Sequence, residues 1–274
     1  MFKIEDLLSL FPNEKTREML IYSYNLSQKK NKTLSDSVFE RLLLLKEQDP
    51  DIDIILDTSK DKSYYSPAEN IIYINDLSIE TFFHELTHLL SYNYLRFQVP
   101  NEYYSFKINF MENPDNTSLI VEFLNLCKKK AELFQKKSLD LYNNKALNEI
   151  NNVHKEPQHS QLFVIRLIED IVDSIFDGQS FSHGIVSIRS NYEIAIRSQK
   201  AVGHGCEYFA NSGYQFEEIL ANYQAIKLTD PNNELFDLLK NILGAEFISF
   251  LDQRCNEICG QISKTEITNN IYKK

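Results

Sequence analysis

The segment TFFHELTHLL, residues 81–90, constrains the fold more than any other part of this chain. His84 and His88 are four residues apart, so on a helix both imidazoles project from one face, one turn apart. Asp76 to Ser78 supply an N-cap signal before this segment. The apolar residues that flank the two histidines indicate a helix whose remaining surface is buried, and they are Phe82, Phe83, Leu86, Leu89 and Leu90. We therefore expect a buried helix over residues 79–94 that presents two histidines together.

Two imidazoles in this arrangement suit two ligands of a tetrahedral zinc ion. Glu85 adjoins the first histidine, and its carboxylate can reach a water molecule on the metal. Zinc lowers the pKa of such a water toward about 7, and the glutamate takes the proton as hydroxide attacks a polarised carbonyl. The pentapeptide therefore predicts Zn²⁺ as cofactor, His84 and His88 as metal ligands, and Glu85 as general base.

The order of the other elements indicates an α+β fold. Three helices are expected within residues 4–48, with breaks near Pro12-Asn13 and residues 30–32. Two β-branched runs, 52–57 and 70–75, predict strands that lead into the histidine helix. The later expected helices span 117–137, 139–152, 160–176, 216–228 and 233–259, and residues 177–215 are expected to be irregular.

We divide the chain into an N-terminal helical extension, 1–50, and a domain, 51–274, with a helical insertion at about 115–200. Most of the glycine of the chain lies within residues 177–215. Such clustering is typical of backbone that turns tightly or approaches a ligand closely. We therefore expect residues 177–215 to border a site.

The third ligand must come from a distant segment, because no further histidine or glycine follows His88 with the HExxHxxGxxH spacing. The best candidate is residues 216–225, FEEILANYQA. The apolar stripe of this segment is Phe216, Ile219, Leu220, Tyr223 and Ile226. Glu218 lies on another face with small alanines that permit close approach, whereas Glu217 points between the two faces. Glu218 is the preferred ligand, and Glu217 and His204 stay open as alternatives.

Two further residues are candidates to support the metal chemistry. Asn222 lies one turn after Glu218 and can accept a hydrogen bond from a ligand histidine. Tyr208 and His204, in a glycine-rich stretch before the ligand helix, are types that can donate a hydrogen bond to a tetrahedral oxyanion. Tyr208 is preferred for that role, with Tyr214 as a weaker alternative.

Charge and hydropathy exclude several classes of partner. The net charge of −10 argues against nucleic acid, which requires a basic face. The acidic N-terminus, MFKIEDLLSLFPNEK, does not resemble a secretory signal, and no apolar run is long enough for a membrane span. We expect a protein made in the cytoplasm. Four scattered cysteines (Cys127, Cys206, Cys255 and Cys259) are interpreted as reduced structural thiols.

The motifs NIIYIND, TFFHELTHLL and FEEILANYQAI together resemble the zincin superfamily, in the gluzincin branch whose third ligand is a glutamate. The last motif is similar to that of lethal-factor-type toxin peptidases. The stretches EDIVDSIFDG and GHGCEYF also look like zincin-like domains of some phage head proteins and bacterial effectors. The resemblance covers about residues 52–250.

Residue by residue, the resemblance implies His84, His88 and Glu218 as zinc ligands, Glu85 as base and Tyr208 as transition-state donor. Two departures matter. The 129 residues between His88 and Glu218 exceed the usual spacing, so a helical insertion must be accommodated. Asn222 also stands where a carboxylate often orients the ligand histidine.

These observations predict a zinc-dependent endopeptidase that acts on a protein substrate. A chain without a signal peptide is also what a toxin or effector translocated by another route would look like, which is an analogy. One alternative is a non-catalytic zincin-like assembly protein of the phage-structural type, although the intact Glu85 speaks against it. Another is a zinc hydrolase that attacks a carbonyl other than that of a peptide.

Overall fold

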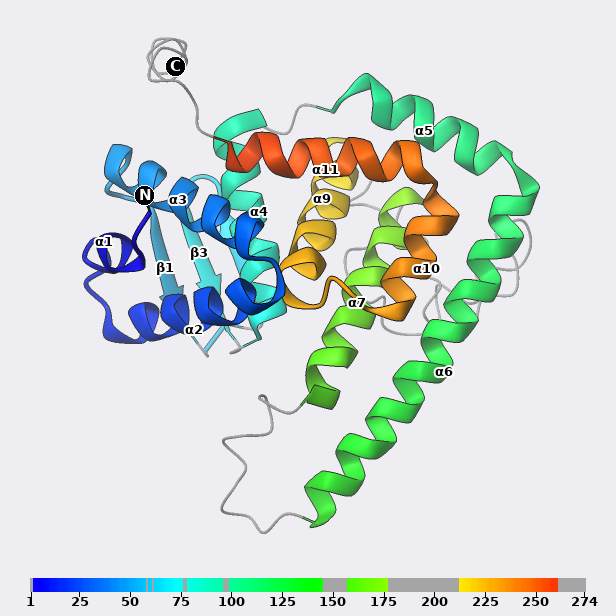
Figure 1. Ribbon diagram of the computed structural model, residues 1–274, viewed down its shortest axis with the longest axis horizontal. Coiled ribbons are helices and arrows are strands. Elements are labelled where there is room, and N and C mark those ends of the chain that lie inside the picture. Colours follow the sequence, from blue (N-terminus) through cyan, green and yellow to red (C-terminus); the bar gives the residue numbers. More distant parts are fainter. Residues whose placement is uncertain are drawn as a thin grey trace.

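The computed structural model describes residues 2–57, 59–60, 62–75, 78–95, 99–144, 157–176 and 212–260. These parts of the chain are mostly helical and include a small three-stranded sheet, as the α+β class predicts (Figure 1). None of the helices in these ranges combines the length and the apolar character that a membrane crossing requires.

The three predicted N-terminal helices are confirmed as α1 (Ile4–Leu8), α2 (Glu14–Lys30) and α3 (Lys32–Gln48). Asparagines separate them. The Asn13 side chain accepts hydrogen bonds from the Lys15 and Thr16 amides and so caps α2. Asn31 accepts from the Leu34 amide and caps α3. The two polar breaks in the sequence are therefore N-caps.

The sheet has the strand order β1-β3-β2. Strands β1 (Asp53–Leu56) and β3 (Ile71–Ile74) are parallel and confirm the two predicted strands. Strand β2 (Tyr64–Ser66) is antiparallel to β3 and was not expected, because three residues show too little alternation to indicate a strand. Contacts with β3 stabilise this short strand, since the Tyr64 ring stacks on Tyr73 of β3 with ring centroids 5.0 Å apart.

Helix α4 (Ile79–Leu95) begins where the motif predicts. The hydroxyl of Ser78 accepts a hydrogen bond from the Thr81 amide and caps its first turn. All five apolar residues that flank the histidines are fully buried, as expected. Helix α4 packs against β2 and β3 on one side and α9 on the other.

The middle of the chain forms α5 (Asn101–Glu112), α6 (Pro114–Asn144) and α7 (Pro157–Ile175). The predicted division into helices 117–137 and 139–152 is wrong, because α6 runs through Ser138 without a break. Ser138 has neighbours of good helix propensity, and no Gly or Pro lies near it. The remainder of the second predicted helix, 145–152, lies outside the described residues.

The chain ends in α9 (Ser212–Thr229), α10 (Glu234–Leu243) and α11 (Ala245–Cys259). The prediction of one helix over 233–259 is wrong. Gly244 has φ 86°, a left-handed conformation that ends α10 and starts α11. The prediction of irregular structure over 177–215 is wrong for residues 212–215, because α9 already begins at Ser212, and residues 177–211 lie outside the described residues.

Helix α9 lies at the centre of the molecule and is buried on nearly all sides by α4, α7, α2 and α11 (Figure 1). The N-terminal helices belong to the same core, since α2 contacts α9 and α3 contacts α11. The division into an extension and a catalytic domain stays a prediction. On a buried helix such as α9, each polar side chain requires a hydrogen-bond or ionic partner.

Candidate metal centre

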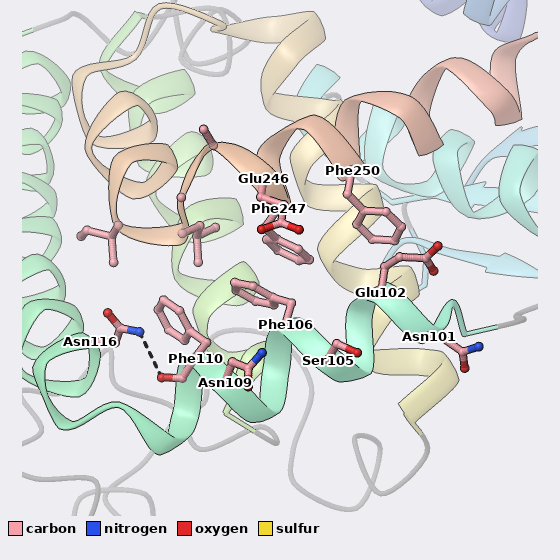
Figure 2. Close-up of a pocket in the computed structure, with 14 residues that line it drawn as sticks. Asn101, Glu102, Ser105, Phe106, Asn109, Phe110, Asn116, Glu246, Phe247 and Phe250 are labelled. Atoms are coloured by element: carbon pink, nitrogen blue, oxygen red, sulfur yellow. Dashed lines mark hydrogen bonds between the residues drawn. The ribbon is translucent and has the colours of Figure 1, made fainter.

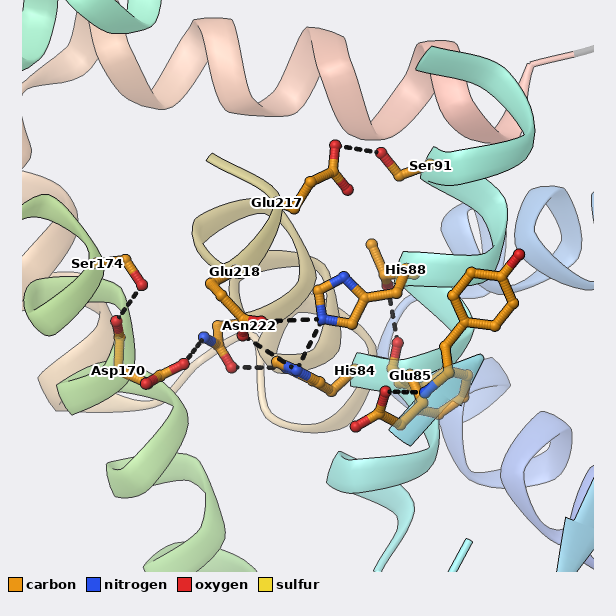
Figure 3. A network of polar contacts seen from close by, with 12 residues as sticks. His84, Glu85, His88, Ser91, Asp170, Ser174, Glu217, Glu218 and Asn222 are labelled. Atoms are coloured by element: carbon orange, nitrogen blue, oxygen red, sulfur yellow. Dashed lines mark hydrogen bonds and ion pairs between the residues drawn. The ribbon is translucent and has the colours of Figure 1, made fainter. Parts of the chain in front are cut away.

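His84 and His88 of α4 face Glu218 of α9 (Figure 3). The Nε2 atoms of the two histidines are 3.0 Å apart. Glu218 Oε2 lies 3.3 Å from His84 Nε2, and Oε1 lies 3.4 Å from His88 Nε2. His88 and Glu218 are 130 positions apart in the sequence. They meet because α4 and α9 pack along each other.

These separations fit a tetrahedral zinc ion. Zinc bonds of roughly 2.0–2.1 Å at tetrahedral angles place neighbouring donor atoms about 3.3 Å apart. The two imidazole nitrogens and the carboxylate are therefore spaced like three corners of such a tetrahedron. His84, Glu85 and His88 also offer ligand atoms that all lie within 4.8 Å of one another. The donor set consequently suits zinc, and its binding of a metal stays a prediction.

The electrostatics of this cluster favour a cation. Burial lowers the pKa of His84, but the hydrogen bond and negative charge of Glu218 outweigh it and raise that pKa to about 10. The Glu218 side chain is only 1% exposed, so water screens its charge weakly. A metal ion would have to displace that proton, because an imidazole binds a metal only in its deprotonated form.

Glu85 is held beside the two histidines by the sheet. Its Oε2 accepts a hydrogen bond of 2.8 Å from the backbone amide of Tyr65 in β2. The unexpected third strand thus positions the predicted base. The carboxylate is mostly buried, with one oxygen fixed by the backbone.

Asn222 lies where helical periodicity predicts, one turn after Glu218, with its Oδ1 2.8 Å from His84 Nδ1. Its Nδ2 donates a 2.6 Å hydrogen bond to Asp170 Oδ2 on α7 (Figure 3). The sequence reasoning missed Asp170. The signal was the set of acidic residues spaced among apolar ones in EDIVDSIFDG, since an acid on a buried helix face needs a partner.

Glu217, the alternative ligand, contacts a different partner. Its Oε1 accepts a 2.8 Å hydrogen bond from Ser91 Oγ on α4, and its Oε2 has no hydrogen-bond partner among the described residues. Burial raises the pKa of Glu217 to about 7, against the opposing effects of His88 and Ser91. The geometry therefore brings Glu218, and not Glu217, to both histidines.

Several predicted residues lie outside the described residues. Tyr208, His204 and Cys206 are among them, so neither the proposed oxyanion donor nor the alternative ligand His204 is placed. Tyr214 lies in the first turn of α9, as expected for that weaker alternative. The thiols of Cys127, Cys255 and Cys259 are free and buried, which agrees with their interpretation as structural residues.

A cavity of about 710 Å³ lies between α5, the start of α6, and the junction of α10 and α11 (Figure 2). Phe106, Phe110, Phe247 and Phe250 form most of its aromatic surface. None of the residues of the metal centre lines it. The polar groups described around it are amides, a hydroxyl and the exposed carboxylates of Glu102 and Glu246.

No model of a protein family, no curated protein and no solved structure matches this chain. The interpretation of the centre therefore depends on its own geometry and chemistry.

Proposed function

We propose that this protein is a zinc-dependent endopeptidase. One observation carries the proposal: His84, His88 and Glu218 converge at tetrahedral spacing while Glu85 stands beside them. Two histidines and a carboxylate leave room in a zinc coordination shell for a fourth, exchangeable ligand. This arrangement is typical of catalytic zinc, whereas structural zinc is closed by four protein ligands.

A zinc ion held by these side chains would lower the pKa of a water molecule toward about 7 and polarise a substrate carbonyl. Glu85 supplies the proton chemistry. Its Oε2 already accepts from the Tyr65 amide, so we assign the proton of the attacking water to Oε1. The same oxygen then delivers the proton to the departing amine. The backbone of β2 keeps the carboxylate from rotating away.

The sheet favours a peptide substrate over other carbonyl compounds. Within the described sheet, β2 pairs with β3 on one side only, and the Tyr65 amide donates to Glu85 and not to β3. The outer edge of β2 therefore runs past the general base. An extended peptide can add to such an edge through main-chain hydrogen bonds other than that of the Tyr65 amide, which Glu85 already accepts. That position would bring its backbone carbonyls to the metal.

The first test combines metal content with cleavage. We expect about one zinc per chain in the wild type and in Glu85→Gln, and a clear loss in His84→Ala, measured by elemental analysis. Proteome-derived peptides incubated with wild type are expected to show new N-termini by mass spectrometry. Glu85→Gln should reduce their formation by about 10²–10⁴-fold, because it removes the base but keeps the ligands.

Three results would contradict the proposal in different ways. A wild type without zinc, even after reconstitution, would remove the metal centre. Zinc without any cleavage would favour the assembly-protein alternative. Cleavage that Glu85→Gln leaves unchanged would exclude this centre as its source.

A further inference from the structure

Asp170 is a buried acid, 6% exposed, on a helix that contributes no predicted ligand. Its Oδ2 accepts the 2.6 Å hydrogen bond from Asn222 Nδ2, and Asn222 Oδ1 lies 2.8 Å from His84 Nδ1. His84 Nε2 in turn faces Glu218 and His88. A continuous chain of polar contacts therefore joins α7 to the metal centre through α9 (Figure 3).

This chain has a fixed direction. The Asn222 amide nitrogen can only donate, and it donates to Asp170 Oδ2, so Asp170 holds the nitrogen end of that amide. The oxygen end of that amide must then face His84, and an amide oxygen can only accept. His84 Nδ1 must consequently carry the proton. In a neutral imidazole, that leaves the lone pair on Nε2, the atom that points to Glu218 and His88.

We propose that Asp170 is a positioning residue of the metal centre, which acts through Asn222 to orient His84 and to hold it in the metal-binding tautomer. In many metal sites a carboxylate contacts the ligand histidine directly. Here an asparagine stands at that place, and the carboxylate lies one residue farther out. Asp170 also adds a negative charge near a centre where two neutral histidines and one carboxylate would leave a divalent cation only half neutralised.

The inference rests on the proposed metal centre but not on peptidase activity. Its matched control is Glu169, the neighbouring residue on α7, which is equally buried at 6% exposure. Glu169 acts electrostatically on Cys127 of α6, whose pKa is raised by burial and then by Glu169. Glu169→Gln and Asp170→Asn are the same chemical change at adjacent positions, and only the second residue touches Asn222.

The experiment measures zinc dissociation constants by competition with a chromophoric chelator, on the full chain. Asp170→Asn and Asp170→Ala should weaken zinc binding by about 10–100-fold. Glu169→Gln should stay within about threefold of wild type. The double variant Asp170→Asn with Asn222→Asp places the carboxylate directly on His84 and keeps an amide partner behind it. It should recover most of the lost affinity.

A structural role alone would give another pattern. Circular dichroism and urea unfolding of the metal-free variants identify any loss of folding or stability, and a loss of zinc affinity in a variant that folds and unfolds like wild type is a result that a structural role would not give. The proposal is overturned if Asp170→Asn binds zinc like Glu169→Gln, or if the double variant recovers nothing. A wild type without zinc binding would overturn it together with the metal centre. Zinc binding without cleavage would overturn the peptidase and leave the role of Asp170 standing.

Discussion

The candidate metal centre and the aromatic cavity are two regions of the same molecule that differ in almost every property. The cavity is large, at about 710 Å³, and phenylalanines line much of it. The metal centre is compact, and each polar group in it contacts another one, from Asp170 and Asn222 to Glu218. Volume and aromatic surface alone would favour the cavity as the binding site.

The chemistry reverses that choice. Buried lone pairs that point at one another are unfavourable unless a proton or a cation lies between them. His84, His88 and Glu218 are arranged in this way, whereas the carboxylates beside the cavity, Glu102 and Glu246, are exposed. The comparison teaches that converging donor atoms indicate a functional site more strongly than empty space does.

The largest effect is expected when the proposed third ligand, Glu218, is removed from the candidate metal centre. Glu218→Ala should weaken zinc binding by more than about a hundredfold, roughly 3 kcal/mol, because it removes one of the three proposed protein ligands. Glu217→Ala is the matched control and should stay within about tenfold, since its Oε1 bonds Ser91 and not a histidine. The measurement is the chelator competition. Equal losses in the two variants would mean that the ligand assignment is wrong.

The next effect concerns the buried acid on α7. Burial raises the pKa of Glu169 to about 7, above the ordinary value of 4.5. The folded state therefore keeps a proton that the unfolded chain has released, and this contribution to stability is lost as pH rises from about 4.5 to about 7. Glu169→Gln should remove that loss, on the order of 2–3 kcal/mol.

Urea unfolding of the metal-free proteins at pH 5 and pH 8 measures this difference. We expect similar stability at pH 5 and a more stable variant at pH 8. A difference between wild type and variant that is the same at both pH values would show that Glu169 is not protonated in the folded state. A fall in zinc affinity in this variant would contradict the use of Glu169 as a control for Asp170.

The smallest expected effect tests the cavity. Phe250→Ala should lower the free energy of unfolding by about 1 kcal/mol, because the half-buried ring loses its contacts with Phe216 and Phe247. Its zinc affinity should match that of wild type within about twofold. Thermal unfolding and chelator competition measure the two quantities. A large loss of zinc would show that the cavity and the metal centre are coupled, through Phe216 beside Glu217.

Much of the local structure could be predicted from sequence. The caps at Asn13 and Asn31 and the buried face of α4 follow from residue type and periodicity. The break at Gly244 could have been predicted as well, because glycine favours the left-handed conformation found there. Strand β2 could not, since three residues form a strand only when a partner such as β3 is already in place.

The sequence by itself determined which side chains share one turn of helix: His84, Glu85 and His88 on α4, and Glu218 with Asn222 on α9. Helical spacing is a local property, so it can be read from residue order alone. Only the tertiary structure decided that Glu218 meets the histidines, that Tyr65 holds Glu85 and that Asp170 holds Asn222. These contacts depend on how distant helices and strands pack, and that packing is set by the whole core.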